Sequence, residues 1–435
     1  MLGALLLVGS ACGIACGPSM TAAPMRTRVP SMAVPSVAGA KTDSMAVPSY
    51  VAGAKMDEMA EAATIAMLKK LESLPVTLPL AMAAGPVSAS FVRTAVASGG
   101  TAPLVVLHGF DSSCLEFRRL LPELEQRGVE AYALDVFGWG FADTSGALTV
   151  SVEAKRAHLY AFWKEVLGGR PMALAGVSLG AAVIIDFYAA HPEAVASAAL
   201  IDPQGFIDGA PPVPEPLARG GIKVLGSWPL RSAANQLAYF DTAVYATDDA
   251  IRVGLLHCAR PGWEDDSVDW LLGGGYSVSP LVPRLAAINT LVMWGRQDKI
   301  LPPEEYAPKF KAALPAATFR WVEECGHSPH LEQPAVLADA LAAFLRGEAV
   351  GGDADFSEVV ALANRTPVEL AQARLAAMNA FLDRPLLDTN ERGGPLEPLK
   401  AWVRTDPETA QLAASVVAVT FFALLFKAAV GVFVH

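Results

Sequence analysis

The chain has little charge, little cysteine and no excess of basic residues. Only 18% of its 435 residues are charged, and 33 Lys and Arg stand against 44 Asp and Glu, a net charge of −11. Because an acidic balance provides no basic surface for a phosphate backbone, we expect no nucleic-acid partner. Five cysteines, two of them near the N-terminus and none in a CxxC pair, exclude a disulfide framework and favour a reducing compartment.

Apolar sequence is abundant, and it is concentrated at the two ends of the chain. Hydrophobic residues make up 53% of the chain, and the mean hydropathy is +0.36. Residues 1–18 lack acidic and basic side chains and predict a signal-like leader. Residues 19–56 repeat the low-complexity segment SMAVPSVAGAK and predict a transit-like segment. This order resembles the bipartite presequences of algae with complex plastids, so we expect a plastid location, with secretion as the alternative.

The C-terminal end predicts a membrane anchor. Residues 411–434 carry one charge, Lys427, and as a helix they reach about 36 Å, enough for a hydrocarbon core of about 30 Å. We therefore expect a transmembrane helix in a plastid membrane, with the globular part on the stromal side; the alternative is a secretory-pathway membrane. Residues 347–410 predict a helical tail that could dock on a membrane protein complex.

Between the ends, apolar runs alternate with amphipathic stretches. Seven runs predict strands: 89–96, 103–108, 130–135, 171–177, 197–202, 289–294 and 317–322. Five stretches predict helices: 114–126, 152–166, 179–190, 304–313 and 334–346. This alternation predicts an α/β domain over residues 89–346, with a mostly parallel sheet and helices on both faces. Residues 57–88 predict a short helix (57–73) and a linker, and the long interval 203–288 predicts an inserted helical lid.

Chemistry-bearing residues follow three of the predicted strands. Gly176-Val-Ser178-Leu-Gly180 lies between a strand and a helix, the setting of a nucleophile elbow. A nucleophilic serine needs a base and an orienting carboxylate, and His327 and Asp298 each follow a strand. His330 is a second candidate base and Asp202 a second candidate acid.

Together, LHGFD, LDVFGWGFAD, GVSLGAA, WGRQDKILP and CGHSPHLEQP resemble the α/β-hydrolase fold-1 superfamily, especially the plastid-directed members of plants and algae. The order Ser178, Asp298, His327 is similar to the order of the catalytic triad in that superfamily. The resemblance implies an oxyanion hole made by the N–H groups of Phe110 and Leu179, and it implies no metal or other cofactor. His108 is expected to stabilise the turn that follows its strand.

The sequence thus predicts a membrane-anchored serine hydrolase that acts on a lipophilic ester, such as a glycerolipid, a carotenoid ester or the phytyl ester of a chlorophyll. Two alternatives remain open: a membrane-bound assembly protein that keeps the hydrolase fold, and a carbon–carbon bond hydrolase. Aromatic residues of the lid are expected either to line the substrate pocket or, for most of them, to form the core of the lid: Phe206, Trp228, Tyr239, Phe240, Tyr245, Trp263, Trp270 and Tyr276.

Overall fold

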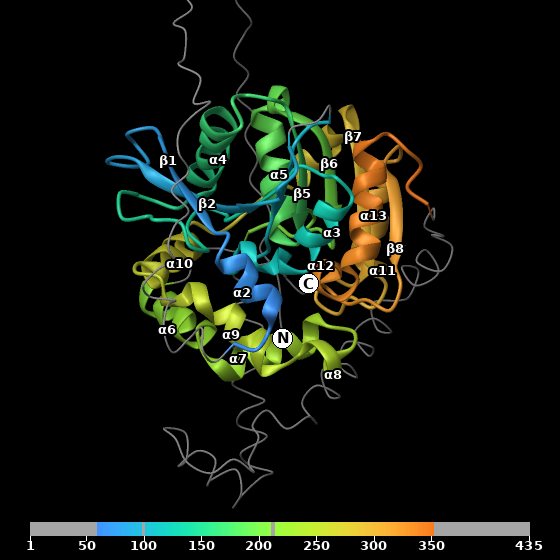
Figure 1. Ribbon diagram of the computed structural model, residues 1–435. Coiled ribbons are helices and arrows are strands. Elements are labelled where there is room, and N and C mark those ends of the chain that lie inside the picture. The colour runs from blue at the N-terminus through green and yellow to red at the C-terminus, as the bar shows by residue number, and fades with distance from the viewer. Residues whose placement is uncertain (1–58, 98–100, 210–213, 352–435) are drawn as a thin grey trace, which may run out of the picture. The chain divides into compact units, whose positions relative to one another are not determined.

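The computed structural model describes residues 59–97, 101–209 and 214–351 (Figure 1). The predicted leader, the transit-like segment, nearly all of the helical tail and the predicted transmembrane helix lie outside these residues. Within the described ranges, no helix is both long enough and apolar enough to cross a membrane.

An eight-stranded sheet organises the described residues, in the order β1-β2-β4-β3-β5-β6-β7-β8. Strands β3 to β8 run parallel, while β1 pairs antiparallel with β2 and β2 pairs antiparallel with β4. The strands are β1 Glu72–Val76, β2 Val87–Arg93, β3 Leu104–Leu107, β4 Ala131–Leu134, β5 Met172–Val177, β6 Val195–Ile201, β7 Asn289–Gly295 and β8 Thr318–Val322. The mostly parallel α/β sheet predicted from the sequence is confirmed.

The central strands are apolar because both of their faces are covered. Every residue of β3, β4 and β5 is buried. Along β5, Leu174 packs into one hydrophobic cluster and Ala175 into the other, as the two-residue period of a strand requires. All seven predicted strands are present, each within two residues of its expected start.

Strand β1 was not predicted. The expected helix over residues 57–73 is shorter, since α2 spans Ala62–Leu68 and Glu72–Val76 instead form the strand at the sheet edge. The segment ESLPV contains Pro75 and is only partly buried, so it lacks the apolar pattern of a central strand. Proline is tolerated in a strand mainly at an edge, where its missing N–H breaks no ladder.

Helices cover both faces of the sheet. Residues of α2, α3 (Leu120–Gln126) and α13 (Pro334–Leu345) belong to one core cluster, and residues of α4 (Val152–Ala161), α5 (Leu179–Ala190) and α11 (Pro303–Ala313) belong to the other. The helix expected over 114–126 begins as a 3₁₀ turn, η1 (Cys114–Arg118), and the one over 152–166 ends in a π-helical turn, η2 (Phe162–Val166). Two further short helical elements are η3 Pro192–Ala194 and α12 Pro329–Glu332.

Helices occupy the interval predicted to be a lid. Figure 1 shows α6 to α10 gathered at one side of the strands. They are α6 Glu215–Leu225, α7 Trp228–Ala238, α8 Thr242–Tyr245, α9 Asp248–Leu256 and α10 Trp263–Leu272, with 3₁₀ turns η4 His257–Ala259 and η5 Ser279–Ala287. We refer to residues 203–288 as the lid.

Candidate active site

Ser178 sits at a strained turn between β5 and α5. Its backbone has φ 52° and ψ −118°, a conformation that a residue with a Cβ rarely adopts. The flanking glycines make the turn possible: a Cβ on Gly176 would lie 2.4 Å from the Gly180 backbone, and one on Gly180 would lie 2.3 Å from the Leu107 carbonyl oxygen. Ser178 is partly exposed, although its neighbours on both sides are buried. The strand-turn-helix setting expected for a nucleophile elbow is therefore present.

His327 and Asp298 are joined by a short hydrogen bond. His327 Nδ1 lies 2.7 Å from Asp298 Oδ2, and Asp298 Oδ1 accepts the N–H groups of Ile300 and Leu301 at 2.8 and 2.9 Å. Both carboxylate oxygens are thus engaged, which fixes the side chain. If Nδ1 carries the proton toward the carboxylate, Nε2 is left unprotonated and can accept one, as a general base must.

Asp202 lies close to Asp298 and His327, but its carboxyl group binds a backbone N–H instead of the imidazole. It is fully buried, and its Oδ1 accepts the Gly295 N–H at 2.8 Å. Burial and the nearby negative charge of Asp298 raise the pKa of Asp202 well above its usual value. Asp298, and not Asp202, is therefore the carboxylate that contacts His327.

His330, the second candidate base, has no such partner. It is 1% exposed, and neither of its ring nitrogens makes a hydrogen bond to any described residue. Burial lowers the pKa of His330 to about 3, and the charge of nearby Arg118 acts in the same direction. The structure thus gives His327, and not His330, the orienting carboxylate that a base requires.

The two N–H groups expected to form the oxyanion hole belong to Leu179, which follows Ser178 in the chain, and to Phe110, which follows Gly109. Leu179 is the first residue of α5, so its N–H has no acceptor within the helix. Phe110 follows β3, where Gly109 brings the loop close: a Cβ on Gly109 would lie 3.5 Å from Ser178 Cβ. The helix dipole of α5 adds to the positive potential at this point.

His108 is a structural residue of the same loop. It is fully buried, its Nδ1 lies 2.8 Å from the Gly109 carbonyl oxygen, and its Nε2 accepts the Val136 N–H at 2.9 Å. An accepting Nε2 leaves the ring proton on Nδ1, and burial lowers the pKa of His108 to about 3. The expected turn-stabilising role of His108 is confirmed.

The lid is attached to the loop that carries His327. The His327 N–H donates to the Ala238 carbonyl oxygen at the end of α7, at 2.6 Å. Glu332, 3% exposed, accepts the Gly326 N–H at 2.8 Å and the lid's Phe240 N–H at 2.7 Å. One carboxylate therefore holds both the histidine loop and the lid segment that follows α7.

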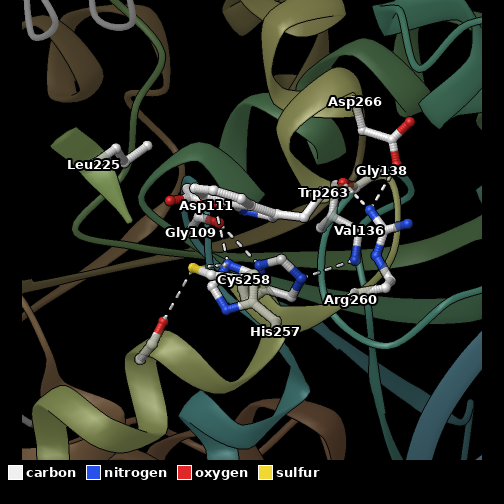
Figure 2. A network of polar contacts seen from close by, with 12 residues as sticks. Gly109, Asp111, Val136, Gly138, Leu225, His257, Cys258, Arg260, Trp263 and Asp266 are labelled. Carbon is white, nitrogen blue, oxygen red and sulfur yellow. Dashed lines mark hydrogen bonds and ion pairs between the residues drawn. The ribbon is translucent and has the colours of Figure 1, made fainter. Parts of the chain in front are cut away.

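A second attachment joins the lid to the loop after β3 through Asp111 (Figure 2). Asp111 is fully buried with φ 46°, and its carboxylate accepts Trp263 Nε1 at 2.8 Å and His257 Nε2 at 3.1 Å. Arg231 of α7 forms an ion pair with the same carboxylate, and its Nη1 donates to the Asp111 carbonyl oxygen at 3.1 Å. Cys258 Sγ lies 3.4 Å from Arg231 Nη2. Three separate lid segments therefore converge on the residue that follows Phe110.

Charge stabilises this second attachment. Burial raises the pKa of Asp111, but the charge of Arg231 and the hydrogen bond from His257 outweigh burial and hold it below its ordinary value. Burial lowers the pKa of His257, yet Cys258 and Asp111 outweigh it and raise the pKa to about 9. At neutral pH the group is therefore an anion between two cations.

Among the residues that the structure describes, two groups of side chains bring possible metal ligands within 4.8 Å of one another: Asp202, Asp298 and His327, and Asp111, His257 and Cys258. In the first group, the Asp298 oxygen nearest His327 is already engaged by the imidazole. In the second, the Arg231 guanidinium occupies the place next to the carboxylate. The prediction that the chain needs no metal stays a prediction.

A cavity of about 270 Å³ lies beside the proposed catalytic residues Ser178 and His327. Ser178, His327 and Phe110 line it, together with Asp111 and residues of the lid helices. Of the lid aromatics named from the sequence, Tyr239 lines this cavity. The hydrophobic core instead contains Trp263, Trp270 and Tyr276. For these three, the expectation of a core position holds, and the expectation that they line the pocket does not.

Sequence reasoning missed the residues that connect the lid to the two loops. Asp111 was visible only as the last letter of HGFD, and its partners Arg231, His257 and Trp263 lie 120, 146 and 152 positions away. No local pattern marks such partners. Glu332 lies five residues after His327, and only this closeness to the histidine motif could have indicated a role from the sequence.

Comparison with known proteins gives a consistent set of relatives. The family model described as the alpha/beta hydrolase family matches residues 104–340. The alpha/beta hydrolase domain-containing protein VTE7 of Arabidopsis thaliana is 37% identical over 65% of this chain and 86% of its own length. The chloroplastic pheophytinase of the same plant is 27% identical over 49% of this chain and 50% of its own length. The solved structure of a thermophilic esterase from Thermogutta terrifontis aligns with a TM-score of 0.52 and 21% identity, covering 63% of this chain and 98% of that one.

Proposed function

The chain belongs to the alpha/beta hydrolase family and is a hydrolase, and we propose that it acts as a membrane-anchored serine hydrolase on a lipophilic carboxylic ester. The observation that carries the proposal is the contact of 2.7 Å between His327 Nδ1 and Asp298 Oδ2, made at the wall of the cavity that also holds Ser178.

In the proposed reaction, Ser178 Oγ attacks the carbonyl carbon of the ester. His327 Nε2 takes the hydroxyl proton and then delivers it to the departing alcohol, while Asp298 holds the imidazole in place and stabilises its positive charge. Water, deprotonated by the same His327, attacks the acyl-enzyme, releases the carboxylic acid and restores Ser178. The strained backbone of Ser178 supports this role, because it presents the side chain away from the strand and the helix.

The tetrahedral intermediate carries a negative charge on the former carbonyl oxygen. We propose that the N–H groups of Phe110 and Leu179 bind this oxygen. Removal of one oxyanion-hole donor typically costs a factor of about 10² to 10³ in rate. Both donors are backbone groups, so their positions depend on the loop after β3 and on the start of α5.

A lipophilic substrate is supported by one wall of the cavity. Apolar side chains of the lid helices α6, α7 and α9 line it: Leu225, Leu230, Ala234, Ala238, Ile251 and Val253. Ligand sites with predominantly apolar walls and a few polar groups favour amphiphilic molecules. A glycerolipid, a carotenoid ester or the phytyl ester of a chlorophyll meets this requirement.

We further propose that the protein is attached to a plastid membrane through residues 411–434. The apolar sequence of this segment and the leader and transit-like segment at residues 1–56 support the proposal, as does the similarity to the chloroplastic pheophytinase. Flotation of the full chain with liposomes tests the anchor. Loss of flotation in a chain truncated after residue 410 is the expected result, and equal flotation of both chains contradicts it.

Labelling with a fluorophosphonate probe tests the catalytic proposal. The wild type is expected to be labelled, and Ser178→Ala is expected to lose the label. Ser328→Ala is the matched control, because Ser328 lines the same cavity without being the nucleophile. Labelling of the Ser178→Ala variant equal to that of the wild type refutes the assignment.

A further inference from the structure

The side chains that line the cavity fall into two chemically different sets. The lid helices contribute the apolar side chains described above, whereas η1, α12 and α7 contribute the polar residues Glu116, His330 and Asn235, which we call the polar wall. None of these three side chains has a part in the proposed triad or oxyanion hole. A polar wall so close to a reactive serine points to a ligand group that the ester bond itself does not account for.

His330 is the central member of this polar wall. Its side chain is 2% exposed, and both ring nitrogens are without a hydrogen-bond partner among the described residues. The nearest acid is Glu116, whose Oε2 lies 3.8 Å from His330 Nε2, which is too far for a hydrogen bond. With a pKa near 3 the imidazole is neutral, so it offers one N–H donor and one acceptor.

Asn235 and Glu116 extend the same wall. Asn235 Nδ2 is buried and has no acceptor within the described ranges, although the residue lies on the lid helix that lines the cavity. Glu116 Oε2 accepts the Gly109 N–H at 3.1 Å, and burial raises the pKa of this carboxyl. Buried donors without partners among the described residues and a nearby carboxyl of Glu116 thus line the same cavity, and polar groups buried in this way normally have partners.

The charges around this end are nearly balanced. Arg118, which also lines the cavity, pairs with Glu61 at 2.5 Å, and Arg119 pairs with the same carboxylate at 2.8 Å. Both arginines pair with Glu61, and the charge of Arg118 also acts on the Glu116 carboxyl. A balanced set of charges gives no strong preference for an anionic or a cationic ligand, and favours an uncharged hydrogen-bonding group.

We propose that His330, Asn235 and Glu116 form a polar subsite that binds an uncharged oxygen function, a hydroxyl or a carbonyl, carried by the substrate in addition to its scissile ester. This rests on the proposed serine hydrolase function and specifies its substrate class. The preferred substrate is an amphiphilic ester with hydrocarbon against the lid and a second oxygen group against His330. A plain alkyl ester leaves these buried groups unpaired and is therefore a poorer substrate.

Matched pairs of esters test the subsite with the full chain in detergent micelles. One pair differs on the alcohol side, propyl octanoate against 2,3-dihydroxypropyl octanoate, and the other on the acyl side, ethyl octanoate against ethyl 8-hydroxyoctanoate. The wild type is expected to prefer the oxygenated member of at least one pair by about 10-fold or more in kcat/KM. The pair that shows the preference tells which side of the ester faces His330.

Three variants test whether these side chains cause the preference for the oxygenated ester. His330→Phe, Asn235→Leu and Glu116→Gln are each expected to bring the ratio of the two kcat/KM values toward one. Asn235→Leu keeps the test decisive if the fully buried His330→Phe fails to fold, because Asn235 lies on a partly exposed lid helix. His191→Phe is the matched control, since His191 is half-buried outside the cavity, and its ratio is expected to equal that of the wild type.

The possible failures are distinguishable. Hydrolysis that depends on Ser178 but shows a wild-type ratio near one for both pairs overturns the polar subsite and leaves the serine hydrolase intact. A preference that survives in all three variants also overturns it. Absence of both hydrolysis and fluorophosphonate labelling overturns the proposed function, and the subsite with it.

Discussion

Among the described residues, two buried aspartates hydrogen-bond to a histidine near the cavity, and the surroundings of these two aspartate–histidine pairs differ. Asp298 Oδ2 lies 2.7 Å from His327 Nδ1, and the remaining oxygen of Asp298 accepts backbone N–H groups of its own loop. Asp111 Oδ1 lies 3.1 Å from His257 Nε2, and the Asp111 carboxylate also contacts a guanidinium and an indole from the lid.

The difference lies in what each imidazole faces. His327 lines the cavity together with Ser178, whereas His257 does not line it and its Nδ1 is buried without a hydrogen-bond partner among the described residues. The same two residue types therefore suit proton transfer in one place and attachment of the lid in the other. A carboxylate–imidazole contact identifies a catalytic pair only when the second ring nitrogen can reach a reacting group.

Asp298→Asn makes the sharpest test of the first pair. The amide no longer stabilises a protonated His327 and permits the wrong tautomer, so kcat is expected to fall by about 10³ to 10⁴. Steady-state kinetics on the better ester substrate measure the change, and thermal unfolding checks that the variant is folded. A loss of less than tenfold contradicts the role of Asp298.

Asp111→Asn tests the second pair and is expected to act first on stability. Removing the charge leaves Arg231 and His257 without compensation in a buried site, which typically costs about 3–5 kcal/mol. Denaturant unfolding measures the loss. The double variant Asp111→Asn, Arg231→Met removes both members of the ion pair, and partial recovery of stability relative to the single variant is expected.

The pH dependence of stability separates the two pairs further. The pKa of His257 is raised to about 9 in the folded chain, above its unfolded value near 6.5. Protonated His257 therefore adds up to about 3 kcal/mol to the free energy of unfolding. This stabilisation is fully present below pH 6.5 and is lost as the pH rises through 9. Unfolding midpoints of the wild type and His257→Gln are therefore expected to differ most at pH 6 and to converge by pH 10. A gap that is constant with pH argues against a protonated His257.

Asp202→Asn is expected to have the smallest effect, although Asp202 places an oxygen within 4.8 Å of possible ligand atoms of Asp298 and His327. Its raised pKa disfavours the charged form of Asp202, and the amide keeps an oxygen for the Gly295 N–H. We expect kcat to change by no more than about threefold, the scale of one neutral hydrogen bond. A loss comparable to that of Asp298→Asn shows that the negative charge is shared by both aspartates.

Some features of the fold were visible in the sequence because they depend on neighbouring residues. The seven apolar strands and the turn at Ser178 follow from runs and motifs of fewer than ten residues. Strand β1 was missed because its five residues include a proline and have only one buried member. The attachments of the lid through Asp111 and Glu332 were also missed, since their partners are distant in the sequence.

By itself the sequence determined that a strand-turn-helix unit presents Ser178, because glycines at 176 and 180 are a local requirement of that turn. It left two aspartates and two histidines as candidates for the partners. Only the tertiary structure decided that Asp298 contacts His327, that Asp202 is buried beside them with a raised pKa, and that His330 lines the cavity without a hydrogen bond to a carboxylate. The reason is physical: distance and burial determine which groups pair and which are charged, and both arise when strands far apart in sequence meet at one edge of the sheet.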